Sequence, residues 1–220
     1  MQERRAAIYG GTFDPVHNGH LKVARRVQRL FGLDEMIFVP ACVPPHKRNS
    51  GITSAFHRFA MLALATENDD RLRVSTIELD QPDRPYAVDT VARMKERQGS
   101  DCRLFFVMGA DSWAEITTWR EWQRLLTMCD HIVVTRPGFE VDVKSSGAAV
   151  ADIRGKSDDE IQAAVAESTT PRVFVTDTVC EDVSATAIRA AARNGRREEL
   201  SKLVPPEVAL HVEKYGLYKN

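Results

Sequence analysis

The sequence predicts an α/β protein in which helices cover both faces of a doubly wound parallel sheet. Short apolar runs recur along the 220 residues, and segments with helical periodicity lie between them. The runs are continuously apolar and do not alternate with polar residues, which is typical of strands buried on both faces. Because these strands alternate with helices, we expect parallel pairing through right-handed crossovers.

The apolar runs predict strands at residues 6–10, 36–40, 72–79, 102–109, 131–137 and 172–178. Helical periodicity and end signals predict helices at residues 19–31, 54–66, 88–98, 119–128, 184–194 and 207–215, the last one stopped by Gly216. Between residues 138 and 171, Ser157 and Glu160 form a capping box ahead of the run IQAAVAE. We therefore expect one domain over residues 1–220, with a surface insert at 138–171 and a helical C-terminal part at 184–220.

Bulk composition limits the classes of function. The chain is 43% hydrophobic and 28% charged, with a formal net charge of -1, which argues against nucleic acid or an anionic membrane as a partner. The cysteines are scattered without a C-x-x-C pair, so neither a zinc site nor a disulfide framework is indicated. No apolar run is long enough for a signal peptide or a membrane span, so we expect a cytoplasmic protein. The oligomeric state stays open, a homo-oligomer included.

Chemically suggestive residues follow the predicted strands. In open α/β sheets, ligands bind in the crevice outside the carboxyl ends of the strands. The segments that would meet there are 10–20, 44–47, 109–111, 136–138 and 182–189.

The first of these segments contains two glycines and two histidines. Gly10 and Gly11 let a ligand approach the backbone, and the helix that follows favours anions at its N-terminus. His17 and His20 are three residues apart and share one helical face. They could pack, hold a metal or bind an anion, although the basic residues that follow them weaken the metal interpretation.

The other segments leave similar alternatives. His46 and Lys47 follow a Pro-Pro pair and form either a stiff donor loop or a solvated basic turn. Asp111 can accept from ribose hydroxyls or cap a helix. Ser184, Thr186 and Arg189 form either a second phosphate cradle or an ordinary capped helix. Trp113, Trp119 and Trp122 offer a stacking surface or core packing.

Eight motifs spread over almost the whole chain carry a resemblance to a known family. They are GGTFDPVHNGHL, VPPHK, DRPYAVDT, GADSW, TTWREW, VVTRPG, VSATAIR and VPPEVALHVEKYGLY. Together they resemble the nucleotidyltransferase superfamily with the H-x-G-H signature, and within it the bacterial nicotinate-nucleotide adenylyltransferase family. The resemblance implies a Rossmann-like fold of the nucleotidyltransferase type. It also implies transfer of AMP from ATP to nicotinic acid mononucleotide, giving deamido-NAD and pyrophosphate, with Mg²⁺ bound through the ATP phosphates.

The resemblance also implies roles for individual residues. For ATP, these are Gly10, Gly11, Thr12, Phe13, His17, His20, Asp111, Arg136, Ser184, Thr186 and Arg189. His17 and His20 would hold the α-phosphate and the departing pyrophosphate, and Lys47 and Arg189 would complete the catalytic set.

The second substrate would meet a further set: His46, Lys47, Tyr86, Ala87, Asp111, Trp119 and Arg120. The substrate loop has Ala87 where the family often has threonine, and Arg120 stands where an aromatic residue is frequent. A carboxylate needs only donors, whereas an amide also needs an acceptor. We therefore expect Arg120 to strengthen preference for the acid over the amide.

Three alternatives remain. The same adenylyl transfer could use nicotinamide mononucleotide or phosphopantetheine as acceptor. The chain could bind ATP without turnover, since helix N-termini bind phosphates regardless of catalysis. A metal hydrolase built on His17 and His20 lacks a convincing further ligand set.

Overall fold

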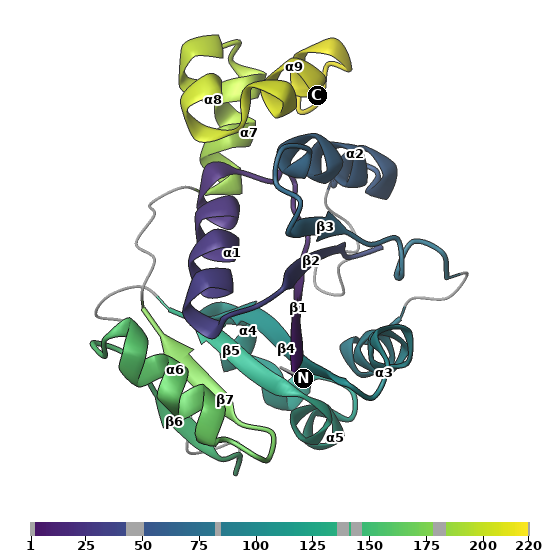
Figure 1. Ribbon diagram of the computed structural model, residues 1–220. Coiled ribbons are helices and arrows are strands. Elements are labelled where there is room, and N and C mark those ends of the chain that lie inside the picture. The colour runs from purple at the N-terminus through teal and green to yellow at the C-terminus, as the bar shows by residue number, and fades with distance from the viewer. Residues whose placement is uncertain are drawn as a thin grey trace.

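A parallel sheet lies at the centre of the computed structural model, which describes residues 3–42, 51–81, 85–135, 141, 147–177 and 184–219. The strand order is β3-β2-β1-β4-β5-β7-β6, and every neighbouring pair is parallel (Figure 1). The strands are β1 (Arg4–Gly11), β2 (Glu35–Pro40), β3 (Leu72–Val74), β4 (Cys102–Gly109), β5 (Asp130–Val134), β6 (Val150–Asp152) and β7 (Val173–Thr176).

Helices cover both faces of this sheet. They are α1 (Asn18–Phe31), α2 (Ala55–Thr66), α3 (Ala87–Gln98), α4 (Ala110–Ala114), the 3₁₀ turn η1 (Ile116–Thr118), α5 (Trp122–Met128), α6 (Asp158–Glu167), α7 (Ala185–Arg193), α8 (Arg197–Leu203) and α9 (Pro206–Lys214). Successive strand residues point to opposite faces, so Ala7 packs with α1, α2 and α6, whereas Ala6 and Ile8 pack with α3 and α5. The predicted doubly wound α/β fold is confirmed.

Helix α1 follows β1 directly and sets the geometry of the first loop. Its apolar stripe, which includes Leu21, Ala24 and Val27, is buried against the sheet. The helix ends where Gly32 takes a left-handed conformation with φ of 58°, and the Gly32 N–H returns to the Arg29 carbonyl at 3.3 Å.

The predicted strand 72–79 was too long, because β3 ends at Val74. The next residues turn the chain: the Ser75 hydroxyl accepts from the Ile77 N–H at 3.2 Å. The predicted helix 119–128 was also too long, because Trp119 has extended backbone and Glu121 is left-handed with φ of 50°. Helices α4 and α8 were not expected.

The expectation of a surface insert at 138–171 was wrong for the part that the structure describes. Strand β6 pairs with β7 and adds an edge to the sheet. Helix α6 has the predicted Ser157–Glu160 capping box, but it buries Ile161 and Val165 completely in the core beside α1. This segment is part of the sheet architecture because its apolar face needs the sheet to cover it.

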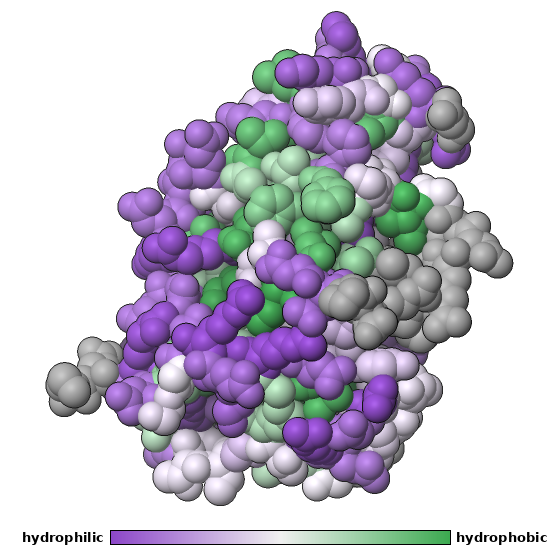
Figure 2. All heavy atoms as spheres, turned by 90° about the vertical axis from the view of Figure 1, so that its right-hand side faces the viewer, coloured by the Kyte–Doolittle hydropathy of each residue, from purple (hydrophilic) through white to green (hydrophobic). Residues whose placement is uncertain are grey.

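Helices α7, α8 and α9 gather above the carboxyl end of β1 (Figure 1). The Asn18 side chain, at the start of α1, donates to the Lys202 carbonyl of α8 at 3.0 Å. Figure 2 shows apolar surface at the level of α2, where Phe56 is 78% exposed. In the described part of the chain, no helix combines the length and the apolar character needed to cross a bilayer.

Candidate functional site

The loops that follow β1, β4, β5 and β7 begin at the same edge of the sheet. Tyr9 of β1 lies opposite Val107 of β4, and Val134 of β5 lies opposite both Gly109 and Thr176. The sheet order reverses between β1 and β4, which is the topological switch point of an open α/β sheet. The loops after these strands therefore start at one level and border one crevice.

The loop after β1 has a conformation that requires Gly11. A Cβ atom at Gly11 would lie 2.8 Å from the Phe13 ring. Phe13 has φ of 51°, and its ring is 2% exposed against Tyr9 and Phe38. Phe13 can therefore offer only its backbone to a ligand.

The two histidines stack at the start of α1. Their ring centroids are 3.6 Å apart with an interplanar angle of 26°. The backbone N–H of His17 donates to Nδ1 of His20 at 3.3 Å, so the neutral His20 ring carries its proton on Nε2. Phe13 meets His20 edge-on at 5.0 Å and fixes the second side of the ring.

Burial keeps both rings neutral. It lowers the pKa of His17 to about 4. Burial also lowers the pKa of His20 well below its usual value, and the neighbouring His17 lowers it further. Nδ1 of His17 is buried and makes no hydrogen bond of normal geometry within the described residues, although the His17 side chain faces the His20 backbone N–H in a capping box. No group of three histidine, cysteine or acidic side chains in the described ranges could hold a metal.

Arg189 joins the C-terminal helices to the loop after β1. It extends from α7, and Nη1 donates to the Asp14 carbonyl at 2.9 Å. Nη2 donates to Thr186 Oγ1 at 3.2 Å, while the Ser184 hydroxyl caps α7 by accepting from the Ala187 N–H at 3.1 Å. These bonds use two of the five guanidinium N–H donors. The bond to Asp14 thus joins Arg189, a member of the predicted second phosphate cradle, to the loop that precedes His17.

Asp111 is exposed and lies in the first turn of α4, which follows β4 without a gap. The N-cap of α4 is Gly109, so the alternative that Asp111 caps this helix was wrong. Asp111 therefore follows β4 closely, at the level where β4 and β5 end.

Four of the predicted acceptor residues lie on the face covered by α3 and α5, namely Tyr86, Ala87, Trp119 and Arg120. Tyr86 caps α3 and is 48% exposed, and the Arg120 guanidinium lies 4.7 Å from its ring centroid. Trp119 meets Phe106 of β4 edge-on at 6.4 Å. The Tyr86 N–H already donates to the Asp89 carboxylate at 3.2 Å. The Asp89 and Thr90 N–H groups return to the Tyr86 carbonyl, which leaves the Ala87 and Val88 N–H groups without a partner inside α3.

Sequence reasoning missed Arg58 of α2, which is 1% exposed. Its guanidinium donates to the carbonyls of Thr12 at 2.7 Å, Ala41 at 2.6 Å and Cys42 at 3.1 Å, and Nε donates to Thr53 at 3.0 Å. The signal in the sequence was a lone arginine within the apolar run of this helix. Four carbonyl acceptors offset the burial of the charge.

Asp14 was also missed as an organising residue. Its Oδ1 accepts from the Tyr218 hydroxyl at 2.8 Å, and its Oδ2 accepts from the Thr53 N–H at 3.4 Å. The end of the chain is thereby tied to the loop after β1. His46, Lys47 and Arg136 lie outside the described residues, so their predicted roles stay predictions.

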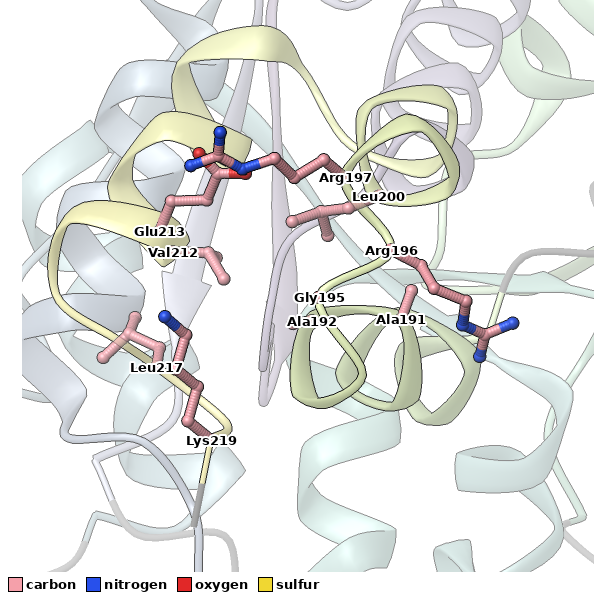
Figure 3. Close-up of a pocket in the computed structure, with 10 residues that line it drawn as sticks. All are labelled: Ala191, Ala192, Gly195, Arg196, Arg197, Leu200, Val212, Glu213, Leu217 and Lys219. Carbon is pink, nitrogen blue, oxygen red and sulfur yellow. The ribbon is translucent and has the colours of Figure 1, made fainter.

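A cavity of about 80 Å³ lies among α7, α8 and α9 (Figure 3). Its lining includes Arg197, which pairs with Glu213 at 2.7 Å. None of the residues predicted to bind ATP or the second substrate lines this cavity. The cavity is therefore separate from the crevice at the strand ends.

Known proteins match this arrangement over nearly the full chain. The cytidylyltransferase-like family model matches residues 8–191. A Thermoanaerobacter protein named "Probable nicotinate-nucleotide adenylyltransferase" is 37% identical and covers 100% of this chain and 96% of its own. The nicotinate-nucleotide adenylyltransferase of Bacillus subtilis is 34% identical, with coverages of 99% and 100%.

A solved structure supports the fold independently. The Plasmodium falciparum nicotinic acid mononucleotide adenylyltransferase complexed with NaAD has a TM-score of 0.72 and covers 98% of this chain and 97% of its own. At 18% identity, this likeness concerns the fold alone.

Proposed function

The chain belongs to the nicotinate-nucleotide adenylyltransferase family, and from this premise we propose that it transfers AMP from ATP to nicotinic acid mononucleotide. The products are deamido-NAD and pyrophosphate, on the route to NAD. One structural observation supports the residue assignments: Arg189 of α7 donates to the Asp14 carbonyl in the same loop that leads into the stacked histidines of α1.

The reaction explains why the crevice needs no activated nucleophile. The attacking group is the phosphate of the mononucleotide, which is already ionised at neutral pH. The protein has to align an in-line displacement and neutralise charge on the transferred and departing phosphates. The described site offers donors for both tasks.

His17 and His20 bind the α-phosphate and the leaving pyrophosphate. Nδ1 of His20 is occupied by the His17 N–H, so Nε2–H is the donor left for phosphate. A neutral ring donates without adding a buried charge of its own to the site. The N-terminal dipole of α1 adds positive potential in the same place.

Arg189, Thr186 and Ser184 bind the β and γ phosphates. Arg189 retains three N–H donors beyond those that hold Asp14 and Thr186. The Ser184 hydroxyl accepts from the Ala187 N–H and can donate its own proton outward. Removing the bond to Asp14 would also take away one of the contacts that hold the loop before the histidines.

Mg²⁺ would enter this site bound to the ATP phosphates, which are hard oxygen ligands of the kind this ion prefers. When bound, the ion supplies neutralisation of phosphate charge. The chain's own contribution is the set of imidazole, guanidinium and backbone donors.

The acceptor binds beside Tyr86, Trp119 and Arg120. The exposed Tyr86 ring already holds a guanidinium at 4.7 Å, so a positive charge stands next to an aromatic surface. The Ala87 N–H adds a backbone donor. Arg120 also lies 3.7 Å from the Glu121 carboxylate, and the positive charge and N–H donors on the other side of its guanidinium favour a pyridine carboxylate over an amide.

Pyrophosphate release from ATP and Mg²⁺ tests this function. Nicotinic acid mononucleotide, nicotinamide mononucleotide and phosphopantetheine are offered separately, with no acceptor as the blank. We expect strong release with the first acceptor. Stronger release with either other acceptor would reassign the substrate, and ATP binding without any release would indicate a non-catalytic nucleotide-binding protein.

A further inference from the structure

A continuous set of polar contacts runs from the loop after β1 to the loop before α3. The two loops carry the proposed contacts to ATP and to the acceptor. Helix α2 packs on one face of the sheet and α3 on the other, so the contacts pass over the strand ends at the crevice (Figure 1).

The contacts begin at Thr12. Its carbonyl accepts from Arg58 Nη1 at 2.7 Å. The C=O and N–H of a trans peptide point in opposite directions within one plane. Fixing this carbonyl therefore fixes the direction of the Phe13 N–H, and Phe13 has only its backbone to offer because its ring is buried.

The contacts continue through the peptide between Ala41 and Cys42, directly after β2. Arg58 Nη2 holds the Ala41 carbonyl at 2.6 Å, and the Cys42 N–H donates to the Glu78 carboxylate. The Ala41 N–H returns to the Gly11 carbonyl at 2.9 Å. The Arg58 guanidinium and the Glu78 carboxyl group thus contact one peptide from opposite sides, and partial burial raises the pKa of Glu78.

The contacts end at the start of α3. Thr90 Oγ1 donates to Glu78 Oε1 at 2.8 Å and also lies 3.3 Å from the Tyr86 carbonyl oxygen. Thr90 is 2% exposed, so water does not compete for its hydroxyl. Glu78 therefore holds the end of the loop on which Tyr86 and Ala87 stand.

We propose that Arg58 and Glu78 are positioning residues that hold the ATP loop and the acceptor loop in register for the in-line displacement. Neither side chain is assigned a contact with substrate; Arg58 acts through backbone carbonyls, and Glu78 acts through the Thr90 hydroxyl beside the Tyr86 carbonyl. A misplacement of 1 Å at a reacting centre can cost on the order of 10²-fold in rate, so small shifts of these loops are sufficient to affect turnover. The inference rests on the proposed function and on the sites assigned above.

Thr90→Val tests the acceptor end, with Thr66→Val as the matched control. Both threonines are buried, and the Thr66 hydroxyl bonds only to carbonyls of its own helix, Leu62 at 2.9 Å and Ala63 at 3.3 Å. We expect Thr90→Val to raise the KM for nicotinic acid mononucleotide about tenfold, with the KM for ATP within about twofold of wild type. Thr66→Val should leave both KM values unchanged. It should lower the melting temperature by about as much as Thr90→Val does.

Arg58→Lys tests the other end, with Arg103→Lys as the control. Lysine cannot reproduce the forked contacts of a guanidinium. Arg103 is also largely buried and holds Asp130 at 2.8 Å and the Val165 carbonyl at 2.7 Å, but it lies near the amino end of β4. We expect Arg58→Lys to lower kcat/KM for both substrates by about 10- to 100-fold, and Arg103→Lys to change melting temperature without changing kcat/KM.

Binding of a non-hydrolysable ATP analogue and of the mononucleotide is measured by calorimetry beside the kinetics. Absence of turnover in the wild type would overturn the proposed function, whereas the binding constants still decide the role of Arg58 and Glu78. If Thr90→Val and Arg58→Lys match their controls in every constant, the two residues are structural and the inference is wrong. If Arg58→Lys does not fold, the comparison of Thr90→Val with Thr66→Val decides whether the inference holds.

Discussion

Gly11→Ala is the substitution whose effect follows most directly from the geometry of the crevice. The added Cβ would lie 2.8, 3.1 and 3.1 Å from three atoms of the Phe13 ring, where ordinary contact begins at 3.4 Å. Relief requires a displacement of about 0.6 Å by the nearest atom. The ring cannot yield freely, because Tyr9, His20 and Phe38 pack around it at centroid distances between 5.0 and 5.6 Å.

The displacement reaches the histidine pair of α1, because the Phe13 ring packs against His20. Overpacking of this kind lowers the free energy of unfolding by about 1–3 kcal/mol. Because the Phe13 ring supports His20, we also expect kcat/KM to fall by roughly 10- to 100-fold. Chemical denaturation and the pyrophosphate-release assay measure the two effects on the same preparation.

Gly51→Ala is the control, since a Cβ at Gly51 meets nothing within 4 Å. The double variant Gly11→Ala/Phe13→Leu removes part of the ring, so its loss of unfolding free energy should be smaller than the sum of the two single losses. If Gly11→Ala matches Gly51→Ala in stability and turnover, the steric argument for the loop after β1 is refuted.

Four further outcomes are expected. His20→Ala should lower kcat by ~10² to 10³ with unfolding free energy nearly unchanged, and near-normal turnover would contradict its assignment as a phosphate donor. Arg120→Ala should reduce the ratio of kcat/KM for the acid over the amide mononucleotide; an unchanged ratio would show that the guanidinium beside Tyr86 does not select the substrate. Burial lowers the pKa of His131 from 6.5 to about 4. As the pH falls below 6.5, the unfolded chain therefore takes up a proton at this histidine before the folded chain does. The free energy of unfolding should consequently fall by ~3 kcal/mol between pH 6.5 and pH 4. His131→Leu should flatten that part of the pH–stability curve, and an equally steep curve would count against the buried neutral ring. Chelation of Mg²⁺ should stop pyrophosphate release without lowering the melting temperature of the ligand-free protein, whereas a lower melting temperature would reveal a metal held by the chain itself.

Much of the architecture could be predicted because its causes are local. The strand runs and the Ser157–Glu160 cap are encoded within a few residues, and the corresponding elements appear with ends that differ by a few positions. The prediction of the nicotinate-nucleotide adenylyltransferase family is confirmed by relatives that match almost the full chain. The errors at residues 72–79 and 119–128 came from single turn residues, which periodicity does not register.

The sequence by itself determined the alternation of strands and helices and the chemistry gathered after the strand ends, since spacing and side-chain type suffice for both. Only the tertiary structure decided that β6 and α6 complete the sheet, that Arg120 stands over Tyr86, and that Arg58 grips carbonyls 46 and 17 residues away in the chain. These features depend on contacts between distant segments. These contacts stabilise the protein only after the sheet has brought the segments together and excluded water. No local sequence pattern therefore predicts them.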